Sequence, residues 1–246
     1  MSELSTRGKR LEALRIAFPH TIPIMAGYLF LGFAHGILMA QDGFSFLWPM
    51  GMAVTIFGGS MEYYAAEELL HVFAPLSMLM MVFIIQSRHL FYGIAMLEKY
   101  KSMGNKRFYL IFGLTDETFS VNSSLELPLT ADRGWVYFFV TLLDHCYWVT
   151  GCTVGGLFGT VLMNAIPGMD QYTTGLDFVM TALFAVILLE QLLKEKKHYT
   201  ALIGAGASLG CLIVFGASTF MVPAMVCILA LLTVFRGPLE KAGGLE

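Results

Sequence analysis

The chain has 246 residues, of which 57% are hydrophobic and only 13% are charged. A soluble domain carries roughly a quarter charged residues, so this composition excludes a soluble fold and indicates that lipid is the solvent. The net charge is −3, and no basic run is dense enough to indicate a nucleic-acid-binding protein.

The first expected element is a basic amphipathic lead over residues 1–21. It lacks the cleavage pattern of a signal peptide, so we expect it to remain uncleaved, and we expect it to lie in the cytoplasm. Apolar stretches of about the 20 residues that a spanning helix needs follow. They cover 22–40, 47–70, 75–97, 108–127, 134–163, 175–193, 199–217 and 219–235. The sequence thus predicts an all-α integral membrane protein, a polytopic bundle of 6–8 membrane segments. One transmembrane domain would cover 22–236, and 237–246 would form a short cytoplasmic tail.

The distribution of lysine and arginine predicts which segments cross, because cytoplasmic loops are enriched in both. The lead and the 98–107 loop are both basic, yet three crossings between them would place them on opposite sides. We therefore expect 47–70 and 108–127 to be broken or re-entrant rather than spanning. With that topology every lysine and arginine except Arg88 is cytoplasmic. A conventional eight-span topology stays open.

The first candidate binding cluster is Gly58, Gly59 and Ser60, followed by Glu62. Two glycines and a serine ahead of a helical run can present free backbone N–H groups to an anion such as a substrate carboxylate. Close helix packing through small residues is the alternative interpretation.

The second cluster is Arg88 and His89, deep in an otherwise apolar segment. Arg88 keeps its charge, so it needs a carboxylate partner, either within the protein or on a substrate. A purely structural ion pair is the alternative. His89 is a candidate proton relay, although a lone buried histidine is more often only hydrogen-bonded.

The third cluster is Asp116 and Glu117. Adjacent residues face different sides of a helix, so one carboxylate can neutralise Arg88 while the other holds an ammonium group or a proton. A solvated loop is the alternative. Asp144 and His145 form a polar notch in 134–163 and complete the proton-coupling candidates.

Two further patterns concern packing and chemistry. Gly151, Gly155 and Gly159 form a small-residue seam for close helix contact, within the chain or with another subunit. No Walker A or H-E-x-x-H motif and no metal-ligand pattern occurs, so we expect neither an enzyme nor ATP use, and no cofactor or metal.

Several motifs occur along nearly the whole chain in an order typical of one family. They are Ala17-Phe18-Pro19 with Pro23 and Gly27-Tyr28, Gly58-Gly59-Ser60, Arg88-His89-Leu90-Phe91-Tyr92-Gly93, Leu114-Thr115-Asp116-Glu117-Thr118-Phe119, Tyr147-Trp148, and Gly175-Leu176-Asp177-Phe178 through Ala182-Leu183-Phe184. In these stretches the chain resembles the AzlC-like family, the large subunit of branched-chain amino-acid exporters.

The resemblance implies secondary-active export of branched-chain or related small apolar amino acids across the prokaryotic plasma (inner) membrane, with a small AzlD-like membrane subunit as partner. The titratable clusters add the expectation of coupling to the proton gradient. A passive channel and a scaffold subunit of a multi-component permease are the alternatives. Where the family usually has Gln this chain has Glu62, and where Asn or Asp is frequent it has Gln86. Both departures leave the substrate and the charge coupling open.

Overall fold

The computed structural model describes residues 6–72, 74–128, 131–165, 198–216 and 220–235, with isolated positions between 182 and 193. Every secondary-structure element within these ranges is a helix, as the sequence predicts. The chain divides into two compact units, Met1–Met180 and Thr181–Glu246, and all candidate site residues belong to the first.

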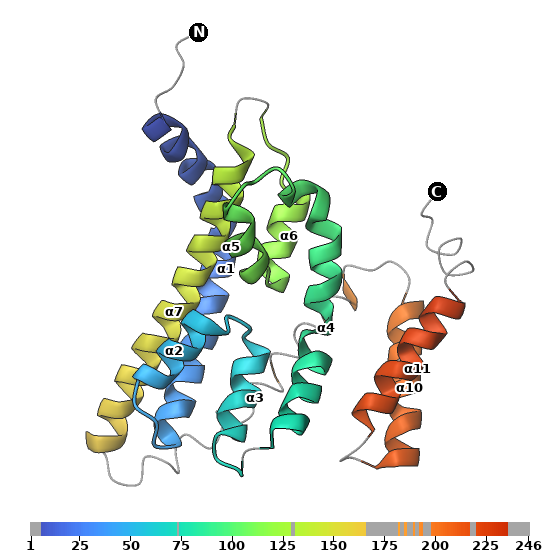
Figure 1. Cartoon of the computed structure of the whole chain (residues 1–246). Coiled ribbons are helices and arrows are strands. Elements are labelled where there is room, and N and C mark those ends of the chain that lie inside the picture. Colours follow the sequence, from blue (N-terminus) through green and yellow to red (C-terminus); the bar gives the residue numbers. More distant parts are fainter. Residues whose placement is uncertain are drawn as a thin grey trace. The chain divides into compact units, whose positions relative to one another are not determined.

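Two long helices, α1 (Thr6–Gln41) and α7 (Arg133–Ala165), run side by side through the first unit (Figure 1). Both are long and apolar enough to span a membrane. α1 continues without interruption across residue 21, so the basic lead and the first apolar stretch, expected as separate parts, share one helix.

The small-residue seam of α7 explains how closely these two parallel helices pack. A Cβ atom on Gly155 would lie 2.1 Å from the carbonyl oxygen of Phe33, nearer than real atoms approach. Gly151 and Gly159 face the backbone of α1 as well, and Gly36 of α1 faces α7. The seam therefore packs against α1 within this chain.

The segment 47–70 is broken, as predicted. α2 (Leu47–Thr55) and α3 (Ser60–Glu68) are joined by a turn over 56–59, and we call the pair hairpin 1. Phe57 in this turn has φ 46°, in the left-handed region that side-chain-bearing residues rarely adopt. Figure 1 shows hairpin 1 rising from the end of the unit where α1 finishes and returning to the same end.

The segment 108–127 is broken in the same way. α4 (Pro75–Tyr100) first carries the chain to the opposite end of the unit, and α5 (Lys106–Phe112) and α6 (Asp116–Ser124) then form hairpin 2, joined over 113–115. α1 with hairpin 1 and α4 with hairpin 2 thus share one order and have opposite directions. This is the pattern of an inverted structural repeat.

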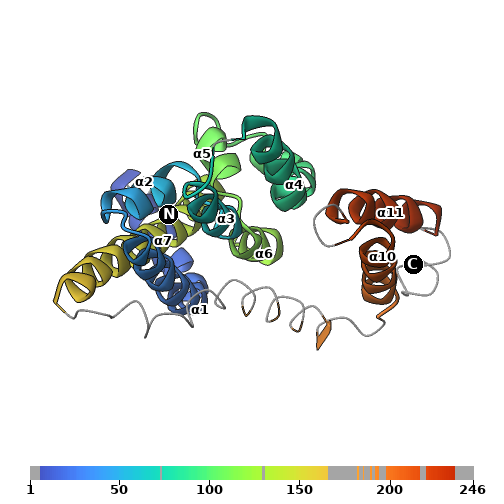
Figure 2. The ribbon, with the colours of Figure 1, turned by 90° about the horizontal axis from the view of Figure 1, so that it is seen from below.

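The tips of the two hairpins meet beside the middle of α7. The rings of Phe57 in hairpin 1 and Phe112 in hairpin 2 have centroids 6.4 Å apart, and the His145 ring of α7 lies 4.4 Å from that of Phe57. Viewed along the helices, α3 of hairpin 1 and both helices of hairpin 2 lie between the α1–α7 pair and α4 (Figure 2). Residues from both tips and from all three long helices therefore converge on one region.

The two basic segments of the first unit lie at the same end of it. The Arg10 guanidinium of α1 and the Lys106 ammonium of α5 both lie over the Trp135 ring, 4.3 and 4.1 Å from its centroid. This is the arrangement that the distribution of basic residues favours if both hairpins turn back.

The second unit contains α10 (Tyr199–Phe215) and α11 (Met221–Val234), which pack against each other and match the predicted stretches 199–217 and 219–235. Most of 175–193, including Asp177 and Glu190, and all of the 237–246 tail lie outside the described residues.

Candidate functional site

The tip of hairpin 1 is held by Gly58 and Glu62. The Gly58 N–H donates to Glu62 Oε1 at 3.1 Å, and a Cβ on Gly58 would lie 2.3 Å from Nε2 of Gln86. This N–H, predicted to be free for an anion, is therefore engaged within the protein. The Gly59 and Ser60 N–H groups, at the start of α3, have no acceptor among the described residues.

Arg88 links the two hairpin tips. From α4, its Nη1 forms an ion pair with Asp116 Oδ2 at 2.6 Å, at the first turn of α6. Its Nη2 donates to Ser60 Oγ at 3.4 Å, at the first turn of α3. The partner that an intramembrane arginine requires is thus Asp116.

The Arg88–Asp116 pair is not sealed in the interior. Its two side chains are 31% and 26% exposed, and Arg88 Nε and Asp116 Oδ1 have no hydrogen-bond partner among the described residues. The Phe119 and Tyr92 rings, on the same two helices, stack with centroids 4.4 Å apart. The pair therefore combines spare donors and acceptors with partial access, as a site for a polar ligand requires.

Glu62 is completely buried, on the side of hairpin 1 that faces α1 and α7. Besides the Gly58 N–H, its Oε1 accepts a hydrogen bond from Trp148 Nε1 at 2.9 Å. Tyr63 is also buried and donates from its hydroxyl to the Leu31 carbonyl at 2.7 Å. Both residues belong to the packing between hairpin 1 and α1.

Glu117 and Asp144 are connected through hydroxyl groups. The Tyr28 hydroxyl donates to Glu117 Oε2 at 2.6 Å and lies 2.7 Å from Thr115 Oγ1. The Thr118 hydroxyl donates to Asp144 Oδ2 at 2.8 Å and lies 3.1 Å from Thr115 Oγ1. Two of the predicted proton-coupling carboxyl groups therefore share one chain of hydrogen bonds, which passes from α1 through hairpin 2 to α7.

Asp116 and Glu117 face different sides of α6, as expected for adjacent helical residues. Asp116 faces Arg88 of α4, whereas Glu117 faces Tyr28 of α1. The interpretation of this segment as a solvated loop is therefore wrong.

The two histidines among the predicted residues differ in their surroundings. His145 lies 2.9 Å from the Tyr109 hydroxyl through Nδ1 and 3.1 Å from the Ala53 carbonyl through Nε2, so it joins α7 to both hairpins. A carbonyl only accepts, so Nε2 carries the hydrogen and Nδ1 accepts from Tyr109. His89 contacts Tyr92 edge to face, and its Nδ1 has no partner among the described residues.

The sequence did not single out His35 of α1. This histidine is completely buried, and its Nε2 lies 3.9 Å from Glu62 Oε2. The sequence feature that could have indicated it is the presence of a histidine within the apolar stretch 22–40. Nothing in the local sequence, however, indicates which carboxylate this histidine faces.

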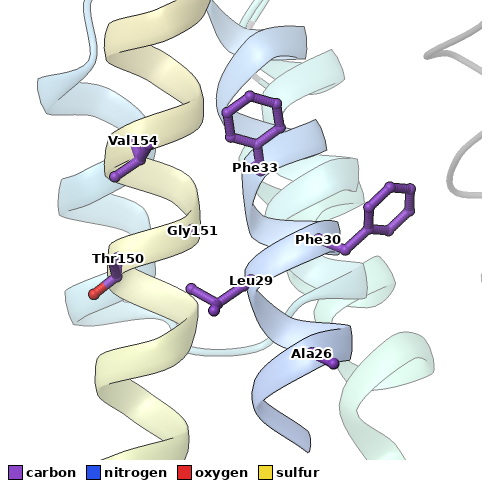
Figure 3. Close-up of a pocket in the computed structure, with 7 residues that line it drawn as sticks. All are labelled: Ala26, Leu29, Phe30, Phe33, Thr150, Gly151 and Val154. Atoms are coloured by element: carbon purple, nitrogen blue, oxygen red, sulfur yellow. The ribbon is translucent and has the colours of Figure 1, made fainter.

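Two surface depressions lie away from these polar residues. An apolar groove of about 460 Å³ runs between α1 and α7, lined by Ala26, Leu29, Phe30, Phe33, Thr150, Gly151 and Val154 (Figure 3). A second depression of about 320 Å³ is lined by His20, Val121, Ser124, Leu125 and Glu126. None of the candidate site residues lines either one.

These features define a helical integral membrane protein whose ionisable residues gather where two broken hairpins meet. Residues 23–162 match the family described as AzlC protein, and the chain belongs to this family. The matched residues run from α1 to α7 and include every candidate site residue.

Similar proteins support the same assignment. The chain is 52% identical to the "Branched-chain amino acid transport protein AzlC" of Bacillus subtilis, over 98% of this chain and 92% of that protein. It is 45% identical to an "Uncharacterized membrane protein" of Haemophilus influenzae, over 93% and 91%, and 24% identical to the "Inner membrane protein YgaZ" of Escherichia coli, over 87% and 88%. These names describe transport and membrane proteins. No solved structure gives a significant match.

Proposed function

We propose that this protein is a secondary-active transporter subunit that exports branched-chain or related small apolar amino acids in exchange for protons. The observation that carries the proposal is the Arg88–Asp116 ion pair between the two hairpin tips. The similar Bacillus subtilis protein, named for branched-chain amino acid transport, supports the substrate class.

An amino-acid zwitterion complements an opened Arg–Asp pair. Its carboxylate replaces Asp116 as the partner of the Arg88 guanidinium, which binds carboxylates through two parallel N–H groups. Its ammonium group replaces Arg88 as the partner of Asp116. The unengaged Gly59 and Ser60 N–H groups, at the start of α3, are additional donors for the carboxylate.

Exchange with protons follows from competition at one carboxylate. A proton on Asp116 and the substrate ammonium group cannot occupy the same oxygen atoms, so release of one permits binding of the other. An inward proton gradient then drives the amino acid outward. The connected carboxyl groups of Glu117 and Asp144, with His89 beside the site, are the candidate path for protons.

The stacked Phe119 and Tyr92 rings, next to Asp116, are the proposed contacts for an apolar substrate side chain. The Phe57 ring packs against His145 of α7 and so supports the tip of hairpin 1 on its α7 side. The Phe57 backbone conformation is the kind of local strain that gathers at functional sites.

We further propose that both hairpins are re-entrant and that the transporter domain covers 22–236 with 6–8 membrane segments. The end of the first unit that carries Arg10 and Lys106 is cytoplasmic in this topology, as the positive-inside rule favours. The membrane is the prokaryotic inner membrane, and the tail at 237–246 is cytoplasmic. A small AzlD-like membrane subunit completes the transporter.

Cysteine labelling tests this topology. In a background without native cysteines, Lys9→Cys and Ser102→Cys should both react with a membrane-impermeant maleimide only from the cytoplasmic side. His71→Cys, which follows hairpin 1, should react only from the outside. If Lys9→Cys and Ser102→Cys have opposite sidedness, hairpin 1 is not re-entrant.

The function is tested with the chain and its partner subunit in proteoliposomes. Efflux of leucine, isoleucine and valine against their concentration gradients is expected when a pH gradient is imposed, and loss of that uphill movement is expected when a protonophore collapses it. Downhill flux alone would instead identify a passive channel. Wild-type transport by the partner subunit without this chain would identify a scaffold.

A further inference from the structure

A second titratable pair lies deeper in the first unit than the proposed substrate site. His35 of α1 and Glu62 of α3 are both 0% exposed. Neither ring nitrogen of His35 has a hydrogen-bond partner among the described residues, and neither does Glu62 Oε2. An unpaired buried polar group costs about 1–3 kcal/mol of folding free energy. A native core therefore keeps several such groups side by side only where they serve a function.

The geometry assigns different roles to the two carboxyl oxygens of Glu62. Oε1 already accepts from the Gly58 N–H and from Trp148 Nε1. Oε2 lies 3.9 Å from His35 Nε2. This separation is too short for an intervening water molecule, and closing it by about 1 Å gives a direct hydrogen bond.

We propose that His35 and Glu62 form a proton-binding pair that holds one proton between Nε2 and Oε2. With neutral imidazole and ionised carboxylate the pair has net charge −1, and binding of the proton brings it to zero. Movement of the proton within the pair breaks the Oε2–H bond as the Nε2–H bond forms, so the charge of the pair is conserved.

The surroundings provide no competing charge. The other titratable groups facing the pair are Tyr63 of α3, whose ring centroid lies 4.9 Å from that of His35, and Cys152 of α7. The Trp148 ring stacks at 6.5 Å from that of His35. In the part of the chain that the structure describes, no lysine or arginine forms an ion pair with Glu62.

The pair is linked to the substrate site through the first turn of α3. Ser60, which accepts from Arg88, is two residues from Glu62, and the Gly58 N–H fixes Glu62 to the tip of the same hairpin. This role rests on the proposed exchange of amino acid for protons. In that exchange, the His35–Glu62 pair binds the coupled proton during its transfer. A shift of hairpin 1 on substrate binding changes the distance from Oε2 to Nε2.

The pair itself is tested by nuclear magnetic resonance of the intact protein labelled with ¹⁵N-histidine, with no transport required. His35→Gln identifies the signal of His35. In Glu62→Gln, which keeps an oxygen for Gly58 and Trp148, the ring ¹⁵N shifts of His35 and their dependence on pH are expected to change. Unchanged shifts and titration of His35 in Glu62→Gln would overturn the proposal.

The role in coupling is tested in proteoliposomes containing the chain and its partner. His35→Gln is expected to lower gradient-driven leucine efflux by about 100-fold, the scale of loss when a proton-transferring group is removed, and to flatten the pH profile. His20 is an exposed histidine on the same helix, hydrogen-bonded to the Ile16 carbonyl. His20→Gln is therefore the matched control and should keep the wild-type efflux rate and the wild-type pH profile.

A wild-type pH profile in His35→Gln would overturn the role of the pair in coupling. If efflux by the wild-type protein is independent of the pH gradient, proton exchange as the proposed function fails. The resonance measurement then decides the existence of the proton-binding pair by itself.

Discussion

Replacing Arg88 with glutamine is expected to abolish amino-acid transport and to lower the yield of folded protein. The substitution leaves the Asp116 carboxylate without its partner at 2.6 Å. Removal of one member of a fully buried ion pair costs about 3–5 kcal/mol, and the partial exposure of this pair reduces the expected cost to about 2 kcal/mol. The measurement is the amount of monodisperse protein after detergent extraction, together with efflux from proteoliposomes.

The double variant Arg88→Gln/Asp116→Asn separates folding from function. It removes both charges at nearly constant volume, so assembly should recover while transport stays absent. Arg107→Gln, at an exposed arginine on the neighbouring α5, is the control and should fold and transport normally. Recovery of transport in the double variant would show that the pair is only structural.

Replacing Gly155 with leucine is expected to prevent α1 and α7 from packing. The added side chain would start 2.1 Å from the carbonyl oxygen of Phe33, and neither helix backbone can move away without opening the whole seam. Overpacking of a well-packed interior costs about 1–3 kcal/mol, and contact with backbone places this site at or above about 3 kcal/mol. Thermal unfolding followed by size-exclusion chromatography measures the loss.

Gly27→Leu is the matched control, because nothing lies within 4 Å of a Cβ at Gly27 on α1. This variant should unfold at the wild-type temperature. If Gly155→Leu instead folds normally and loses only its partner subunit, the seam contacts that subunit and the internal packing described here is incorrect.

The breaks in the two hairpins could be predicted from the sequence because they have local causes. The glycine pair at Gly58 and Gly59 interrupts a helix, and the positions of the basic residues favoured turning back over a full crossing by either segment. The opposite orientation of Asp116 and Glu117 followed from helical periodicity alone.

The remaining features depend on contacts that local sequence does not encode. The spacing of Gly155 and its neighbours indicates close packing but does not identify the facing helix. The sequence does not show where the Glu62 side chain lies, so the Gly58 N–H was assigned to a ligand. In the structure this N–H donates to Glu62. His35 and Glu62 are far apart in the chain, so their proximity follows only from the packing of hairpin 1 against α1.

Equilibrium binding of radiolabelled leucine to the purified complex tests most directly the claim that the Arg88–Asp116 pair is the substrate site. The double variant Arg88→Gln/Asp116→Asn should fold but bind leucine at least about 100-fold more weakly, since loss of buried charge contacts to a ligand costs about 2–5 kcal/mol. The Arg107→Gln control should bind with wild-type affinity. Wild-type affinity in the folded double variant would contradict the assignment of the site.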